Sequence, residues 1–122
     1  MASIIPAAEQ MQAFASAPIE GPILMVNLLR FKAEGGREEY QRYAELVGPH
    51  LARVGGRVVF HASGKATVIG DDAWDEVLIV EYPSRQAFLD MVGSEDYLAA
   101  AAHRTRALDD SRLYCTQPGA LG

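Results

Sequence analysis

The chain has 122 residues, of which 49% are hydrophobic and 22% are charged, so residues 1–122 fit a single domain with a real apolar core. A formal net charge of -5 excludes the basic face with which proteins displace counterions from nucleic acids. No apolar stretch reaches the roughly 20 residues of a membrane-spanning helix, and the first ten residues do not resemble a signal peptide. We therefore expect a cytoplasmic protein that binds neither nucleic acid nor membrane.

The first half of the chain predicts a short helix, a strand and a longer helix. Residues 7–15 (AAEQMQAFA) form a weak helical pattern that Pro18 stops, and residues 23–32 are apolar enough for a buried strand. Between residues 35 and 56, apolar and aromatic side chains recur at helical spacing. Because Pro49 has no backbone N–H, we expect it to kink or restart this helix.

The second half predicts two strands, two helical stretches and a last strand. The first of these strands is rich in β-branched residues and is interrupted by Gly64, which indicates a bulge or bend. Ser84 and Ser94 are well placed as N-caps of the two helical stretches. The expected ranges are 57–70 and 74–83 for the two strands, 85–92 and 97–108 for the helices, and 112–117 for the final short strand.

The order of elements is β-α-β-β-α-β with a short extra N-terminal helix, which predicts an α+β fold of the ferredoxin-like sandwich type. Its two halves resemble one another, since "LMVN" ending at Asn27 and "LIVE" ending at Glu81 occupy the same place in each half. We expect the first and third strands to be parallel neighbours at the centre of the sheet. Asn27 and Glu81 would then project from one face.

The first and third strands are apolar at almost every position, a pattern typical of strands that are buried on both faces. Two helices in this topology cover only one face of the sheet. A second copy of the chain is the economical cover for the other face. We therefore predict a homodimer whose two sheets pack face to face.

Three segments together resemble the family known as domain of unknown function 1330. They are "MVNLLRFK", the "GG" before the second strand, and "WDEVLIVEYPSRQAFLDM" with the "SEDY" and arginine that follow, so the resemblance spans about Leu24 to Leu113. It implies a dimeric α/β-barrel built from two ferredoxin-like subunits. The positions that match the polar and aromatic signature of this family are Asn27, Arg30, Tyr43, Trp74, Asp75, Glu81, Tyr97 and Arg104.

The resemblance does not select a reaction. The wider barrel superfamily includes cofactor-free monooxygenases, muconolactone isomerase-like enzymes, haem-dependent enzymes and proteins with no known chemistry. The candidates must therefore be weighed residue by residue.

The first candidates are polar residues in apolar strands. An unpartnered buried polar group costs about 1–3 kcal/mol, so Asn27 and Glu81 indicate either a polar cleft or local pairing. In a cleft, Glu81 would be a general base, with Asn27, Arg30 or Tyr43 polarising and orienting the substrate. In the alternative, Glu81 pairs with Arg30 or Arg104 and Asn27 caps a neighbouring loop.

Further candidates could bind the substrate. His61 could exchange protons near neutral pH, and Trp74 could form the floor of a small-molecule cleft. Arg104 could anchor an anionic group with its planar guanidinium, while Tyr43 and Tyr97 matter only if their hydroxyls point into a cavity. Each also has a structural interpretation, as a core or surface residue, a staple of the hairpin or dimer interface, or an ion-pair partner.

We expect neither a metal nor a cofactor. The single cysteine, Cys115, has no His or Cys at ligand spacing, and the three histidines are scattered, which leaves haem as a remote alternative. We therefore predict a small-molecule-binding protein that performs cofactor-independent proton transfer, of the isomerase kind, on a compact organic substrate. The alternatives are a non-catalytic binding or structural homodimer and, less favoured, a monooxygenase-like or haem-binding protein.

Overall fold

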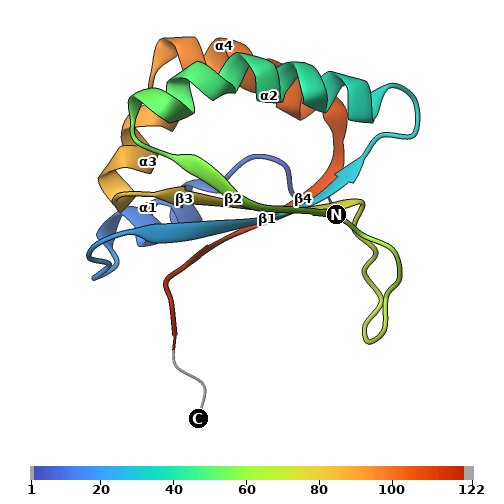
Figure 1. The fold of residues 1–122 in the computed structure, drawn as a ribbon, viewed down its shortest axis with the longest axis horizontal. Helices are drawn as coiled ribbons and strands as arrows, with labels where there is room; N and C mark the ends of the chain where they lie inside the picture. The colour runs from blue at the N-terminus through green and yellow to red at the C-terminus, as the bar shows by residue number, and fades with distance from the viewer. Residues whose placement is uncertain (1, 120–122) are drawn as a thin grey trace.

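The structure is a computed structural model in which residues 2–119 are described. The helices and strands, in chain order, are α1 (Ala8–Ser16), β1 (Ile23–Phe31), α2 (Gly36–Arg53), β2 (Arg57–Ser63), β3 (Glu76–Tyr82), α3 (Arg85–Val92), α4 (Glu95–Ala107) and β4 (Leu108–Thr116). The long helices α2 and α4 lie side by side over one face of a four-stranded sheet, and the described helices leave the opposite face uncovered (Figure 1). None of these helices is long and apolar enough to cross a bilayer.

The sheet has the order β2-β3-β1-β4, so the ferredoxin-like prediction is confirmed. The prediction that β1 and β3 are parallel is wrong, because they pair antiparallel. Helix α2 carries the chain back so that β2 runs in the same direction as β1, and the β2–β3 connection then reverses it. Since β3 is inserted between β1 and β2, it opposes both neighbours.

The register of this pairing also separates Asn27 from Glu81. Asn27 pairs with Leu78, whereas Glu81 pairs with Leu24. Directly opposed residues share a face, and residues three apart on one strand point to opposite faces. The prediction that Asn27 and Glu81 project from one face is therefore wrong, since Asn27 faces the helices and Glu81 faces the uncovered side.

The core lies between the sheet and the helices. The helix-facing positions of β1, such as Ile23, Met25 and Leu29, are buried, while the alternate positions Leu24 and Val26 keep partial exposure. Six buried side chains form the centre of the core: Ile23, Met25, Val80, Tyr82, Phe88 and Met91.

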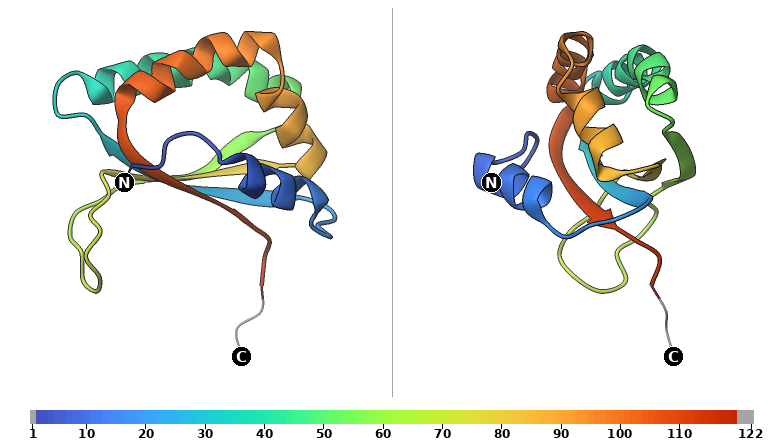
Figure 2. Two further views of the ribbon diagram at one scale, coloured as in Figure 1. Left: turned by 180° about the vertical axis from the view of Figure 1, so that it is seen from behind. Right: turned by 90° about the vertical axis from the view of Figure 1, so that its left-hand side faces the viewer.

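Helix α1 lies at the flank of the sheet, beside β4 (Figure 2). It is attached to α3 by an edge-on contact between the rings of Phe14 and Phe88, whose centroids are 5.6 Å apart. Arg85 of α3 donates to the backbone carbonyls of Phe14 and Ala17, which fixes the end of α1. The extra N-terminal helix is therefore an integral part of the fold.

The helix ends agree with the sequence predictions more closely than the helix interior does. The hydroxyls of Ser84 and Ser94 accept hydrogen bonds from the N–H groups of Ala87 and Tyr97, at 3.0 and 3.2 Å, so both predicted N-caps are confirmed. Helix α2, however, continues through Pro49 for one more turn without restarting. Pro49 sits so near the end of the helix that the missing backbone bond does not stop it.

Strand β2 is shorter than predicted, because the chain leaves the sheet after Ser63 and residues 64–75 form a loop. The irregularity in β2 falls between Val58 and Phe60, where the pairing with β3 shifts. Gly64 instead marks the base of the loop, where its N–H donates to the carbonyl of Asp75 at 2.8 Å. At the other end of the chain, β4 begins at Leu108 and is longer than the expected final strand.

We expect Gly64→Ala to destabilise the protein by about 2–3 kcal/mol. A Cβ atom at this position would lie 1.9 Å from the backbone oxygen of Trp74, a clash that no side-chain rotation relieves. Gly48→Ala is the matched control, because Gly48 lies inside α2 with open space around it, and alanine there should be stabilising by about 0.5–1 kcal/mol. Urea denaturation measures both changes, and a wild-type midpoint for Gly64→Ala would contradict the packing described.

Candidate functional site

A cavity of about 1290 Å³ lies between the helix-covered face of the sheet and helices α2 and α4, and the N-terminal segment 3–6 closes part of it. Ligand sites typically have volumes of about 300–1000 Å³, so this space can hold a compact organic molecule. Most of its wall is apolar, from side chains such as Met25, Leu29 and Val80. The wall also contains hydrogen-bonding and charged side chains, among them Asn27, Arg37, Tyr40, Tyr43, His61, Glu76, Tyr97 and Arg104.

Glu76 is the buried carboxylate of this cavity, with 5% of its surface exposed at the start of β3. Its Oε1 accepts from Arg37 of α2 at 2.5 Å, and its Oε2 lies 2.9 Å from Nε2 of His61 on β2. The Ser63 hydroxyl adds weaker contacts at 3.4 Å. Two basic groups and a hydroxyl thus compensate for the loss of water around a carboxylate that the fold removes from solvent.

The contact with Glu76 orients His61. Since an ionised carboxylate can only accept, this contact favours the tautomer with the proton on Nε2, in which Nδ1 is the acceptor nitrogen. The His61 side chain is 61% exposed and lines the cavity, so it joins the buried carboxylate to the solvent side. This arrangement is suited to proton transfer.

Asn27 lies in the cavity wall, on the helix-covered face of the sheet. Its Nδ2 donates to the carbonyls of Leu78 and Met25 at 3.3 and 3.4 Å, which are long hydrogen bonds. Leu78 pairs with Asn27 on one side and with His61 on the other. Asn27 and His61 therefore flank the same residue on one face of the sheet.

Three tyrosines of the cavity wall, Tyr40, Tyr43 and Tyr97, form a connected row on the helices. Tyr43 and Tyr97 place their hydroxyl oxygens 3.0 Å apart, and the ring of Tyr40 lies 5.2 Å from that of Tyr43. Burial raises the pKa of Tyr40 to about 12 and holds the pKa of Tyr43 well above its ordinary value. The Tyr40 and Tyr43 phenols are thus protonated at neutral pH and can donate hydrogen bonds.

Arg104, near the end of α4, is half-buried in the cavity wall. It donates to the backbone carbonyl of Ile4 at 2.6 Å. Its positive charge acts on the Tyr40 phenol, where it opposes the rise in pKa that burial causes. Among residues 2–119, no carboxylate lies within ion-pair distance of Arg104.

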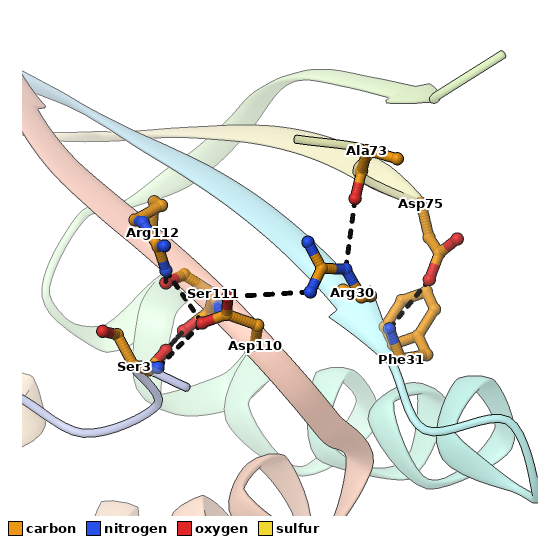
Figure 3. A network of polar contacts seen from close by, with 8 residues as sticks. All are labelled: Ser3, Arg30, Phe31, Ala73, Asp75, Asp110, Ser111 and Arg112. Atoms are coloured by element: carbon orange, nitrogen blue, oxygen red, sulfur yellow. Dashed lines mark hydrogen bonds and ion pairs between the residues drawn. The ribbon is translucent and has the colours of Figure 1, made fainter. Parts of the chain in front are cut away.

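Three predicted site residues lie outside this cavity. Glu81 forms an exposed ion pair with Arg57, at 2.9 Å, on the uncovered side of the sheet. Arg30 donates to the carbonyl of Ala73 at 3.2 Å (Figure 3), and its guanidinium also lies 4.9 Å from the Trp74 ring centroid. The structure therefore does not bring Glu81, Arg30 or Trp74 together with Asn27.

Sequence reasoning missed Glu76 and Arg37. Glu76 and Glu81 are five residues apart in one strand, so they must face opposite sides of the sheet. Glu76 shares its face with Leu78, Val80 and Tyr82, of which the last two are buried. The alternation of side chains along β3 is therefore visible in the sequence. It identifies Glu76 as a site residue only when one knows which face of the sheet the helices cover.

Among residues 2–119, no three His, Cys, Asp or Glu side chains are grouped as they would be to ligate a metal ion. The only described cysteine, Cys115, has a pKa raised by burial, which disfavours its thiolate form. The chemistry that the cavity offers is therefore that of His61, Glu76, the tyrosines, Asn27 and the arginines.

Asp110 of β4 holds the N-terminal segment against the cavity. Its Oδ1 accepts from the backbone N–H of Ser3 at 2.7 Å and from Arg112 at 2.8 Å, and Arg30 lies 3.7 Å from its Oδ2 (Figure 3). The Ser111 hydroxyl donates to the Ser3 carbonyl at 2.5 Å. The contacts of Asp110, above all the bond from Ser3, lower its pKa to about 2.

We expect Asp110→Asn to lower the melting temperature at pH 6 but to have progressively less effect in acid. The pKa of Asp110 is lower in the folded chain than the value of about 3.9 typical of unfolded aspartate, so its carboxylate stabilises the fold fully above that pH. This contribution is lost as the pH falls toward 2. Thermal melts from pH 6 to pH 3 would measure the narrowing difference; Asp109→Asn, an exposed neighbour, is the control. A constant difference would contradict this assignment.

The fold and the cavity together define a small ferredoxin-like α+β domain with an internal ligand-sized space. The chain belongs to the family of domain of unknown function DUF1330, whose sequence model matches residues 33–115. No curated protein is detectably similar in sequence.

Solved structures extend this result. RPA0582, a protein of unknown function from Rhodopseudomonas palustris, is 36% identical over 99% of this chain and 100% of its own, with a TM-score of 0.91. SnoaB, a cofactor-independent oxygenase from Streptomyces nogalater, is 17% identical over 84% of this chain and 97% of its own, with a TM-score of 0.60. A dimeric protein of unknown function with a ferredoxin-like fold from Bacteroides fragilis is 8% identical over 79% and 95%, with a TM-score of 0.54. The last two likenesses show the fold alone.

Proposed function

We propose that the protein is a cofactor-independent enzyme that moves a proton on a compact organic molecule held in the cavity. The observation that carries this proposal is the contact of 2.9 Å between His61 and the buried Glu76. His61 would accept the substrate proton at Nδ1, and Glu76 would stabilise the imidazolium that forms. Arg37 holds Glu76 in place from the opposite side.

The reaction begins at a C–H bond made acidic by a neighbouring carbonyl. The proton moves to His61, and the electron pair stays on the substrate as an enolate. Asn27 and the hydroxyls of Tyr43 and Tyr97 are donors in the same wall that can bind the developing negative oxygen. Where a C=C bond of the substrate is conjugated with this enolate, return of the proton to the far carbon shifts the double bond and completes an isomerisation.

Deuterium exchange tests this proposal even where the product has not been identified. A panel of small carbonyl compounds would be incubated with the protein in D₂O, and loss of the α-proton signal would be followed by proton NMR. We expect exchange of at least one compound, slowed about 100-fold or more by His61→Gln. His50→Gln is the control, since His50 contacts Arg53 on α2 and does not line the cavity. Equal rates in wild type and His61→Gln would overturn the proposal.

A non-catalytic binding protein is the second candidate, and one observation favours it. Glu76 already contacts Arg37, His61 and Ser63, a set that would satisfy a purely structural buried carboxylate. In that case compounds would bind in the cavity with no His61-dependent exchange.

We also propose that the protein works as a homodimer through its uncovered sheet face. Val26 and Ile79 pair with one another on this face and are only partly buried in the single chain. The β2–β3 loop projects on the same side, away from the helices, and its Val68 and Ile69 are 90% and 93% exposed (Figure 1). A second copy would cover both the apolar face and this loop.

A further inference from the structure

We propose that the substrate of this cavity carries a carboxylate, and that Arg104 binds it. This inference rests on the proposed function for the site, and it names the class of molecule on which the His61–Glu76 pair acts. It comes from the charge balance of the cavity wall.

Other arginines near the cavity have acidic partners. Arg37 pairs with Glu76 at 2.5 Å, and Arg112 pairs with Asp110 at 2.8 Å. Arg104, in contrast, contacts a neutral backbone carbonyl and, among residues 2–119, no carboxylate.

The acidic residue that α2 presents to α4 is already in use. Glu39 of α2 contacts His103 and lies 3.3 Å from Arg106, and it also pairs with Arg42 at 3.1 Å. His103 and Arg106 flank Arg104 in α4, so the helix directs those two side chains to the acid and Arg104 to the cavity wall. Arg104 therefore has no ion pair with Glu39, whose partners are Arg42, His103 and Arg106.

A guanidinium is charged at every physiological pH and carries five N–H donors in a planar fork. The bond to Ile4 uses one donor. Arg104 also acts on the Tyr40 hydroxyl, and the wall around both groups is mostly apolar, where a charge-assisted bond to an anion is stronger than in water. A carboxylate matches the geometry of the fork.

A chain of side-chain contacts connects Arg104 with the proton-transfer pair. Arg37, the partner of Glu76, lies 4.8 Å from the Phe31 ring centroid, and Phe31 lies 5.4 Å from the ring of Tyr40. Tyr40 in turn is the phenol on which Arg104 acts. Two aromatic rings of the cavity wall, Phe31 and Tyr40, therefore connect Arg104 with Arg37 and its partner Glu76.

This row of side chains indicates a flat or unsaturated molecule whose carboxylate lies at Arg104. Its body would pack on Phe31 and Tyr40, and its acidic C–H would reach His61. The proton passes to Nδ1 of His61 while the carboxylate stays ionised throughout.

Phenylacetate and phenylacetamide are suitable probes, because they differ in charge but hardly in shape. Isothermal titration of the full chain would give both dissociation constants. We expect wild type to bind phenylacetate at least 10-fold more tightly than phenylacetamide, and Arg104→Gln to reduce this preference to less than 2-fold. Arg106→Gln, two residues along the same helix but paired with Glu39, should keep the wild-type preference.

Arg104→Lys retains the positive charge and serves as a second variant in case Arg104→Gln does not fold. Its preference for phenylacetate over phenylacetamide should lie between those of wild type and Arg104→Gln. Equal binding of the two probes by wild type, or an unchanged preference in Arg104→Gln, would overturn the inference. The proposed function fails separately. Arg104-dependent binding without deuterium exchange in any carboxylate contradicts the enzyme, whereas His61-dependent exchange confined to neutral compounds contradicts only the anion site.

Discussion

Glu76→Gln is expected to lower the rate of substrate deuterium exchange about 100-fold or more while the fold is retained. Glutamine has the shape of glutamate but no charge, so the imidazolium of His61 loses the carboxylate that lies 2.9 Å away. Arg37 loses its ionic partner at the same time. Because both partners are partly exposed, we expect a stability loss of only about 1–3 kcal/mol, measured by urea denaturation alongside the exchange rate.

The same strand provides the control for this experiment. Glu81→Gln removes a carboxylate that is also paired with an arginine, but on the uncovered side of the sheet. We expect an exchange rate within about 2-fold of wild type, since this carboxylate lies away from the cavity. If Glu81→Gln slows exchange as much as Glu76→Gln does, the assignment of the cavity face as the site of chemistry is wrong.

Val26→Asp is expected to raise the dissociation constant of the homodimer by about 100-fold or more. Val26 lies at the centre of the uncovered face, opposite Ile79 on β3 and Tyr114 on β4. By symmetry, each dimer would contain two new carboxylates with no cationic partner in an apolar interface. Light scattering should then give the mass of two chains for wild type and of one chain for the variant at micromolar concentration.

Leu46→Asp is the matched control, since Leu46 is 47% exposed on α2, on the helical layer. It should leave the dimer intact. Val26→Thr is a milder variant for the case in which Val26→Asp does not fold. It preserves the shape of the side chain and should weaken the dimer less. Wild-type protein that is monomeric at micromolar concentration would contradict the interface.

Local chemistry explains which parts of the fold could be predicted. The order of elements follows from hydrophobic periodicity, and both N-caps follow from a serine placed before a helical pattern. Pairing of strands is not local. Asn27 pairs with Leu78, 51 residues away, and the residues of neither strand show whether the two strands run parallel or antiparallel.

The same reason explains the errors in the predicted site. Choosing the wrong direction for β3 placed Glu81 beside Asn27, whereas the register places Glu76 on the cavity face. Arg37 has the pattern of an ordinary charged residue at a helix start, and its contact with Glu76 spans 39 residues. His61, Tyr43, Tyr97 and Arg104 do lie in the cavity wall, but the sequence could not show that a cavity existed.

The alternation of side chains along β1 separates two properties of this protein. Met25, Asn27 and Leu29 line the cavity, while Val26 and its alternate neighbours lie on the side proposed for the partner. If the proposed ligand site and dimer interface are correct, a substitution in the first set would alter ligand binding and a substitution in the second would alter assembly. On these proposals, ligand preference and quaternary structure could diverge independently among homologues, even though one nine-residue strand would carry both.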